Sequence, residues 1–280
     1  LLAKNLWYFV VDSSGSMSDK AISATKAVLD CVDTQLSADE EVRIIFFDNT
    51  TSGSKKWSSM DSRSKVQFIQ YFKNNFICDG GTRLFDTVAE VLADVNRDKP
   101  NFNNINVLIL SDGEDTASKV HSSWSSIDKA SAELLADKSK GVLLQWYTIG
   151  FNPPQDKRPV HIETVHEANP QVIKIIPKPT ADFDVFPRKT VVGTQVMFDL
   201  KRMAGGAVKN CVWYFGDGQK AELNGEELDT KHKYDETGQY TVTLEVFGDG
   251  GSTKKTITNA IQVVDKVSLE PDFTWVPENP

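Results

Sequence analysis

Four short apolar runs, separated by stretches of helical pattern, dominate the first 150 residues. The runs are Leu6–Val11, Val42–Phe47, Val107–Leu110 and Val142–Ile149. Each is nearly continuous rather than alternating, which is typical of strands buried on both faces of a sheet. Such strands need helices on both sides, so these runs favour one class of fold.

Three stretches between the runs have the periodicity of amphipathic helices. Their apolar stripes are Ile22, Thr25, Val28, Leu29, Val32 and Leu36 within Ser18–Leu36; then Leu84, Val88, Val91, Leu92 and Val95; then Trp124, Ile127, Leu134 and Leu135. Strands alternating with helices predict an α/β fold with a doubly wound, mostly parallel sheet. We also predict an edge strand within Thr50–Trp57 and a last short strand at Val172–Ile176.

After Pro177-Lys178-Pro179 the helical pattern stops. Short strands with turn residues between them follow at Gln195–Leu200, Val208–Phe215, Gln239–Phe247 and Thr256–Val264. In the third, Tyr240, Val242, Leu244 and Val246 alternate with polar residues, as in a half-buried strand. This pattern predicts a small all-β sandwich.

A short internal repeat extends the pattern. Asp182-Phe183-Asp184-Val185-Phe186-Pro187 returns as Asp272-Phe273-Thr274-Trp275-Val276-Pro277, about one sandwich length later. We therefore predict three parts: an α/β domain at residues 1–177, a sandwich at 178–266 and the start of a second sandwich at 267–280. Both ends have the appearance of cuts through a longer protein.

Three polar clusters lie where a parallel sheet binds ligands, beyond the carboxyl ends of its strands. Asp12-Ser13-Ser14-Gly15-Ser16 follows the first run, Asp112-Gly113-Glu114-Asp115 follows the third, and Gly80-Gly81-Thr82 precedes the second helix. If the first strand is central, five hard oxygen ligands can meet: Asp12, Ser14, Ser16, Thr82 and Asp112. Such ligands select Mg²⁺, Mn²⁺ or Ca²⁺ over zinc or copper. We expect Asp12, Ser14 and Ser16 to alternate along an extended turn, with Gly15 letting the backbone approach the ion.

These residues resemble the von Willebrand factor A domain and its metal-ion-dependent adhesion site. The match consists of D-x-S-x-S at Asp12–Ser16, the G-G-T loop ending at Thr82, and S-D-G-E around Asp112. The resemblance implies a Rossmann-like fold in which those five residues ligate Mg²⁺, and a protein partner whose Asp or Glu carboxylate completes the coordination. The segment Asn152–Glu163 departs from the family's pattern and leaves the last helix undefined.

The second region resembles a PKD domain, an immunoglobulin-like sandwich of extracellular arrays. The resemblance is carried by Trp213-Tyr214-Phe215-Gly216-Asp217-Gly218, by His232-Lys233-Tyr234 and by Gly238-Gln239-Tyr240-Thr241-Val242. The family's usual motif is W-D-F-G-D-G, from which Tyr214 departs. The resemblance implies that Asp217 builds a turn rather than binds a ligand.

Simpler and catalytic alternatives explain these residues less well. A helix N-cap needs one Ser or Asp, not two acids and several hydroxyls. A phosphate loop of the form G-x-x-x-x-G-K-[ST] and a G-x-S-x-G elbow are both absent from the sequence. A phosphoaspartyl hydrolase would need an acid where Ser14 stands. These observations predict a protein that is not an enzyme.

The net charge limits the classes of partner, and the cysteine content limits the number of disulfides. A net charge of −8 argues against nucleic acid and against contact with anionic membranes. Three cysteines, Cys31, Cys78 and Cys211, are too few for a disulfide scaffold. Buried free thiols are the favoured interpretation, with a Cys31–Cys78 bridge left open.

The sequence therefore predicts an extracellular or cell-surface adhesion module that recognises a protein through a divalent metal, with PKD-type domains as spacers. One alternative is a structural component of a larger assembly, in which the metal mainly stabilises the head. Another is an A domain that docks on an intracellular ATPase, which the PKD-like repeat disfavours.

Overall fold

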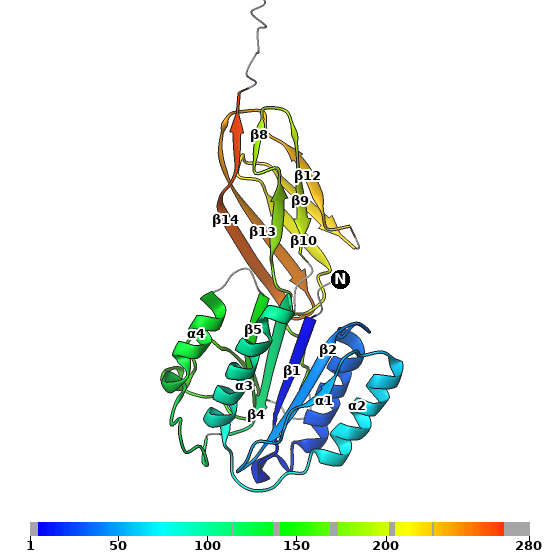
Figure 1. Cartoon of the computed structure of the whole chain (residues 1–280), viewed down its shortest axis with the longest axis vertical. Helices are drawn as coiled ribbons and strands as arrows, with labels where there is room; N and C mark the ends of the chain where they lie inside the picture. The colour runs from blue at the N-terminus through cyan, green and yellow to red at the C-terminus, as the bar shows by residue number, and fades with distance from the viewer. Residues whose placement is uncertain are drawn as a thin grey trace, which may run out of the picture. The chain divides into compact units, whose positions relative to one another are not determined.

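The computed structural model describes residues 5–113, 115–136, 141–168, 173–201, 205–225 and 227–265. It contains two compact units (Figure 1). The first is built on the chain up to Thr180. The second is built on Ala181–Lys201, Lys209–Val246 and the strand that continues beyond Lys254. Each unit is described by itself.

One six-stranded sheet forms the centre of the first unit. Its strands are β1 (Asn5–Asp12), β2 (Glu41–Phe47), β3 (Lys55–Trp57), β4 (Asn104–Ser111), β5 (Gly141–Ile149) and β6 (Glu163–Glu167). Their spatial order is β3-β2-β1-β4-β5-β6, and every neighbouring pair is parallel except β2 with β3. The predicted doubly wound, mostly parallel sheet is confirmed, with the first strand inside it.

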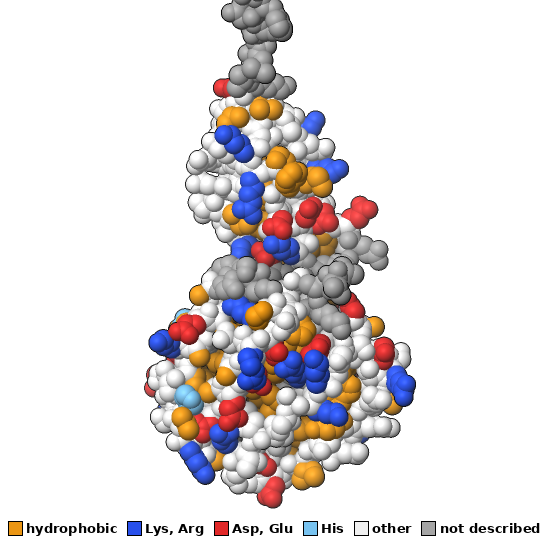
Figure 2. Space-filling model, in the orientation of Figure 1, with side chains coloured by type: hydrophobic (Ala, Val, Ile, Leu, Met, Phe, Trp, Pro, Cys, Tyr) orange, Lys and Arg blue, Asp and Glu red, His pale blue; other side chains and the backbone are white. Residues whose placement is uncertain are grey.

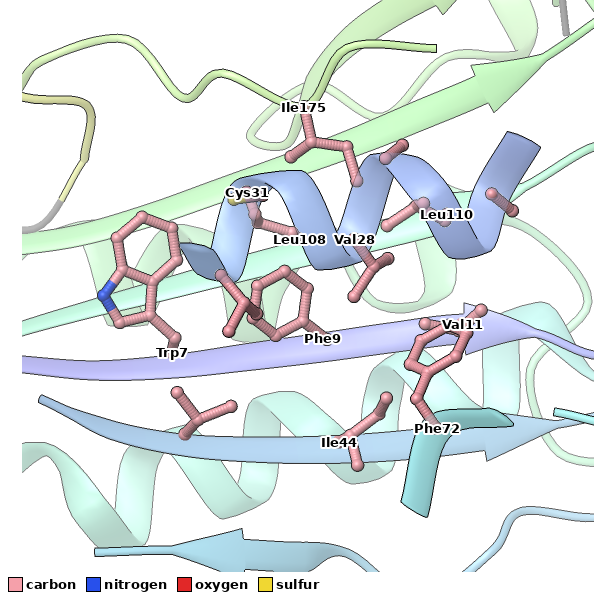
Figure 3. Packing of buried hydrophobic residues seen from close by; sticks show 14 of the residues in the cluster. Trp7, Phe9, Val11, Val28, Cys31, Ile44, Phe72, Leu108, Leu110 and Ile175 are labelled. Carbon is pink, nitrogen blue, oxygen red and sulfur yellow. The ribbon is translucent and has the colours of Figure 1, made fainter. Parts of the chain in front are cut away.

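Helices cover both faces of this sheet, as Figure 1 shows. They are α1 (Ala21–Gln35), α2 (Ser62–Asn75), α3 (Leu84–Asp98) and α4 (Asp128–Ala136), with 3₁₀ turns at Gly15–Met17, Lys99–Asn101, Trp124–Ser126 and Gln155–Lys157. Trp7, Phe9 and Val11 of β1 pack with α1 and α2 (Figure 3), while alternate residues of β1 pack with α3 and α4. Burial on both faces is why the strand sequences are continuously apolar.

The structure corrects three sequence predictions in this unit. Helix α2 was not expected; it buries Phe68 and Phe72, and Asp61 caps its first turn by accepting from the Ser64 N–H at 2.8 Å. The last strand is Glu163–Glu167, a half-exposed edge without an apolar run, whereas residues 173–176 form no strand. Ile22, placed on a buried stripe, is 86% exposed. The predicted edge strand is present at the edge of the sheet, but it is limited to Lys55–Trp57 of the stretch Thr50–Trp57.

The second unit is a two-sheet β-sandwich, as predicted. Its strands are β7 (Phe183–Phe186), β8 (Lys189–Val191), β9 (Gln195–Leu200), β10 (Asn210–Tyr214), β11 (Lys220–Asn224), β12 (Thr230–Lys233), β13 (Gly238–Gly248) and β14 (Gly251–Val264). One sheet has the order β11-β10-β13-β14-β8 and the other β12-β9-β7. Val242, Leu244 and Val246 are fully buried on one face of β13, so the alternating pattern is confirmed. The repeated motif at 272–277 lies outside the described residues.

The W-Y-F-G-D-G segment forms a tight turn that holds the sandwich together. Gly216 has φ +87°, and a Cβ there would lie 2.4 Å from the carbonyl oxygen of Thr241. Asp217 accepts from the Gln219 N–H at 2.9 Å, and its other oxygen lies 2.6 Å from His232 Nε2. These contacts support the structural role expected for Asp217.

The cysteines are not paired in disulfides: Cys31 and Cys211 are buried and Cys78 is half-buried. Burial raises the pKa of the Cys211 thiol to about 11. None of the helices that the structure describes is long and apolar enough to cross a membrane. On the face drawn in Figure 2, acidic and basic side chains are interspersed over the described part of the first unit.

Candidate metal centre

The predicted site residues lie at the point where the strand order of the sheet reverses. Strands β1 and β4 are neighbours, and the connections that follow them run to opposite sides of the sheet. Asp12 is the last residue of β1, and Asp112 directly follows β4. Open parallel sheets bind ligands in the crevice at this position.

Asp12 is held at the base of the site by hydrogen bonds from both sides. Its Oδ1 accepts from the Ser14 N–H at 2.9 Å, and its Oδ2 accepts from the Ser111 hydroxyl at 2.6 Å. The residue is fully buried. Burial raises the pKa of Asp12 above its usual value, and the bonds from Ser111 and Ser14 oppose that shift. A buried carboxylate in this state is stabilised by a nearby cation.

A chain of hydrogen bonds connects the first loop to Asp112. The hydroxyls of Ser14 and Ser16 are 3.1 Å apart, and Ser16 Oγ donates to Asp112 Oδ1 at 2.9 Å. The predicted extended turn is wrong, because Gly15–Met17 forms a 3₁₀ turn. That turn, rather than strand-like alternation, places Ser14 and Ser16 side by side.

Lys20 contacts the same cluster and was missed in the sequence. Its ammonium lies 2.8 Å from Asp112 Oδ2, a carboxylate only 2% exposed, and it donates to the Ser16 carbonyl at 2.9 Å. Burial works against the charge, but the contacts with Asp112 and Asp19 raise the pKa of Lys20. The spacing of four residues from Ser16, on the approach to α1, is the signal that could have revealed it. Ser111, next to Asp112 in the chain, was missed in the same way.

Thr82 belongs to a neighbouring loop that is bonded to the first one. The Gly15 N–H donates to the Gly80 carbonyl at 3.0 Å, and the Asp79 N–H to the Ser13 carbonyl at 2.9 Å. Thr82 is buried, and its N–H donates to Thr116 Oγ1 at 2.8 Å rather than to a side chain of the cluster. Within the described residues no hydrogen bond joins the Thr82 hydroxyl to the other four. The structure thus links four predicted ligands directly and positions Thr82 through its backbone.

Glycine is required in the second loop rather than the first. Gly80 has φ +73°, and a Cβ there would lie 2.6 Å from Asn49 Nδ2. A Cβ on Gly81 would lie 2.8 Å from Asn49 Oδ1, the atom that accepts the Gly81 N–H. A Cβ on Gly15 would meet nothing closer than 3.4 Å. Crowding by protein atoms therefore does not require glycine at position 15, and the role of Gly15 in close approach to an ion stays a prediction.

The ligand set fits a hard divalent cation. Two buried carboxylates and three hydroxyls supply oxygen alone, which Mg²⁺, Mn²⁺ and Ca²⁺ prefer. The described residues contain no cluster of three or more His, Cys, Asp and Glu side chains suited to a metal. A cation here would therefore depend on the hydroxyls and on a group from outside. Lys20 already compensates one of the two carboxylates.

Comparison with known proteins identifies the second unit. The PKD domain family matches residues 177–263, which include the Gly216–Asp217 turn. Residues 177–263 form a PKD domain. No curated protein matches the chain as a whole. The first unit has the doubly wound, mostly parallel sheet that the von Willebrand factor A resemblance implies, so an α/β unit with this fold precedes the PKD domain.

Three solved structures are similar to parts of the chain. A structure of carbohydrate-binding modules from the β-sandwich superfamily has 29% identity, with a TM-score of 0.27 over 33% of this chain and 36% of that one. The chain thus covers about a third of that structure. The PKD1 domain of Vibrio anguillarum Epp has 28% identity and a TM-score of 0.25, covering 31% of this chain and 96% of its own. A von Willebrand factor type A protein from Catenulispora acidiphila has 12% identity and a TM-score of 0.46, covering 94% of this chain and 67% of its own.

Proposed function

We propose that the first unit binds Mg²⁺ and, through it, an acidic side chain of a protein partner. The hydrogen-bonded chain from Asp12 through Ser14 and Ser16 to Asp112 carries this proposal. These residues lie at the switch point of the sheet, which is the position where such folds bind ligands. The general role, a protein-interaction module, is supported by the A-type fold together with the PKD domain.

Each of the three loops would supply ligands to the cation. Asp12, Ser14 and Ser16 supply ligands from the first loop, Thr82 from the second and Asp112 from the third, directly or through water. Mn²⁺ and Ca²⁺ have the same preference for oxygen. A divalent ion with two carboxylate ligands keeps a positive charge, which favours a carboxylate from the partner. Ser111 positions Asp12 by its hydrogen bond.

We further propose that the protein is not an enzyme and acts outside the cell or at its surface. None of the described site residues forms a nucleophile and base pair of the kind that acyl transfer needs. PKD domains are typical of extracellular proteins, and here the PKD domain would act as a spacer. Nucleic acid and lipid are not expected partners, since the net charge is −8.

Magnesium binding tests the first step directly. Titration calorimetry of the full chain should detect one site for Mg²⁺, and Asp12→Ala should abolish it. Asp30→Ala, an exposed acid on α1, is the matched control and should bind as the wild type does. Equal binding by Asp12→Ala and wild type would exclude this metal centre.

Partner recognition is tested by selecting random peptides displayed on phage against the full chain in Mg²⁺. Peptides that EDTA releases should be enriched in Asp or Glu. Retention of the same peptides in EDTA would contradict the metal-bridged mechanism.

A structural role is the second candidate. The hydrogen bonds of Asp12 and Asp112 integrate the site into the fold, which favours a metal that stabilises the unit within a larger assembly. In that case chelation would lower the melting temperature while peptide binding would persist.

A further inference from the structure

A cavity of about 550 Å³ opens in the first unit beside the candidate metal centre. Its walls come from the start of α3, the loop after β4, the segment Ser122–Ser125, β5 and the connection between β5 and β6. This volume is in the range of pockets that hold small ligands or side chains. The metal centre does not use the pocket.

Four aromatic side chains contribute to the lining: Phe85, Trp124, Trp146 and Phe151. Phe85 and Trp124 meet edge to face with centroids 5.2 Å apart, and Trp124 and Trp146 lie 4.8 Å apart. Phe151 adds a further ring to the pocket. The buried indole N–H of Trp146 has no hydrogen-bond partner in the part of the chain that the structure describes. Such surfaces favour an aromatic occupant, because rings pack edge to face or offset against one another.

Asp115, Asp128, Asp156, Lys157 and Arg158 are the charged residues that line the pocket, and three of them have hydrogen bonds to the backbone there. Asp115 accepts from the Phe85 N–H at 3.2 Å, and Asp128 from the Val160 N–H at 3.3 Å. Arg158 donates to the Pro153 carbonyl at 2.9 Å. With three acids and two bases, the lining has no large excess of either charge, which favours a neutral side chain as the occupant.

The rim of the pocket is the segment that departs from the A-domain pattern. Pro153, Arg158 and Val160 line the pocket, and the hydrogen bonds of Arg158 and Val160 hold this segment in place. Val160 is 75% exposed, so an apolar side chain at the rim faces solvent. The segment has a preformed shape and an exposed apolar edge, both features of recognition surfaces.

The pocket begins where the metal centre ends. Gly113 lines the pocket and directly follows Asp112 in the chain. A Cβ on Gly113 would lie 4.0 Å from Ser16 Oγ. A partner that places a carboxylate at the metal can therefore reach the pocket with a residue close to its acid.

We propose that the pocket receives an aromatic side chain of the same protein partner whose carboxylate reaches the metal. The proposal rests on the proposed function and adds the chemistry of the partner: an acidic residue followed or preceded within a few positions by Phe, Tyr or Trp. The carboxylate supplies metal dependence, and the ring supplies specificity.

The test extends the peptide selection described above. Peptides selected by the full chain in Mg²⁺ should contain an aromatic residue close to the acid. Ser122→Trp places a bulky side chain at an exposed position of the pocket wall. It should abolish the aromatic preference and retain the acidic one, while Ser54→Trp, at an exposed position outside the lining, should retain both.

A selected peptide then gives a quantitative check. Val160→Asp should weaken its binding about tenfold, because a charge replaces apolar contact with the ring. The same peptide with its aromatic residue changed to Ala should bind Val160→Asp and wild type equally. Val66→Asp, at an exposed valine on α2, should bind as the wild type does.

The outcomes separate the two proposals. Acidic peptides without an aromatic preference, or an aromatic preference that survives in Ser122→Trp, would overturn the pocket assignment and leave the metal centre standing. Aromatic peptides that lack an acid and survive EDTA would overturn the metal-dependent function and the link between the two sites. Selection of no peptide would overturn both.

Discussion

The two aspartates of the candidate metal centre are stabilised in different ways. Asp12 is surrounded by neutral hydrogen-bond donors, and burial raises its pKa. Asp112 is paired with the Lys20 ammonium. A divalent cation that binds here gains from Asp12 and must overcome repulsion from Lys20. Lys20 therefore sets part of the affinity of the site.

Replacing Lys20 by Met should have opposite effects on the metal-free and metal-bound protein. Without metal, the nearly buried Asp112 carboxylate loses its partner, and the free energy of unfolding should fall by about 1–2 kcal/mol. Affinity for Mg²⁺ should rise about tenfold, since one like charge is removed. Urea unfolding in EDTA and calorimetric titration measure the two effects. Lys26→Met, at an exposed lysine on α1, should change neither.

Asp86 predicts a pH dependence of stability. Burial opposes its ionisation, but the N–H groups of Lys119, His121 and Val120 donate to it, and together with Arg83 they lower its pKa below 3.8. Its stabilising effect is therefore present above pH 3.8 and is lost as the pH falls through the folded-state pKa.

Asp86→Asn should lower the free energy of unfolding by about 2 kcal/mol at pH 7, because an amide NH₂ then faces backbone donors. The difference in the free energy of unfolding between the variant and the wild type should become smaller below pH 3.8. Urea unfolding at pH 7 and pH 3 measures this change. Asp94→Asn on the same helix is the control, and a gap that does not depend on pH would contradict the assignment.

Turns and loops position most residues of the candidate metal centre, and a turn also makes the tightest contact in the PKD domain. The 3₁₀ turn Gly15–Met17 aligns two serines, and the loop at Gly80 is bonded to it through the Gly15 N–H. In the PKD domain, the turn at Gly216 and Asp217 packs against β13. A Cβ on Gly80 would meet the Asn49 side chain at 2.6 Å, and a Cβ on Gly216 would meet the Thr241 backbone at 2.4 Å.

Two nearby glycines of the PKD turn allow the stability cost of crowding to be measured separately from the cost of the left-handed backbone conformation. Gly216 and Gly218 have φ of +87° and +90°, but only at Gly216 would a Cβ collide, 2.4 Å from the Thr241 carbonyl oxygen. Both Gly→Ala variants should cost about 1 kcal/mol for the left-handed conformation. Gly216→Ala should cost about 2 kcal/mol more, since the turn must move. Thermal unfolding of the two variants tests this, and equal losses would contradict the close approach.

Among the described residues, each unit buries hydrophobic side chains of its own. The core of the first unit surrounds its parallel sheet, and the core of the PKD domain surrounds Trp213 and Phe198. All five proposed cation ligands belong to the first unit. Stabilisation by a ligand should therefore appear only in the unit that binds it.

Calorimetric unfolding of the full chain should show two transitions. Mg²⁺ at about 100 times its dissociation constant should stabilise the first unit by about 2.7 kcal/mol, which raises its melting temperature by about 8 °C. The transition of the PKD domain should not move, and Asp12→Ala should remove the shift. A shift of both transitions would show that the units unfold together.

The fold class could be predicted because strands that are buried on both faces have continuously apolar sequences. Uninterrupted apolar runs such as Val107–Leu110 identify central strands, and Leu84–Val95 identifies a helix with one buried face. Elements at the edge of the sheet have less distinctive sequences. Strand β6 is half-exposed, so its polar sequence resembles a loop, and Ile22 shows that an apolar residue at a helix end need not be buried.

The sequence by itself determined which oxygen ligands are present and in which order, because D-x-S-x-S and S-D-G are local motifs that follow apolar strands. Only the tertiary structure decided that β1 and β4 are neighbours, that Lys20 pairs with Asp112, and that the 153–160 segment closes an aromatic pocket beside them. These are contacts between residues far apart in the chain or turned by a local 3₁₀ geometry. No periodicity encodes them, since they depend on how the elements pack.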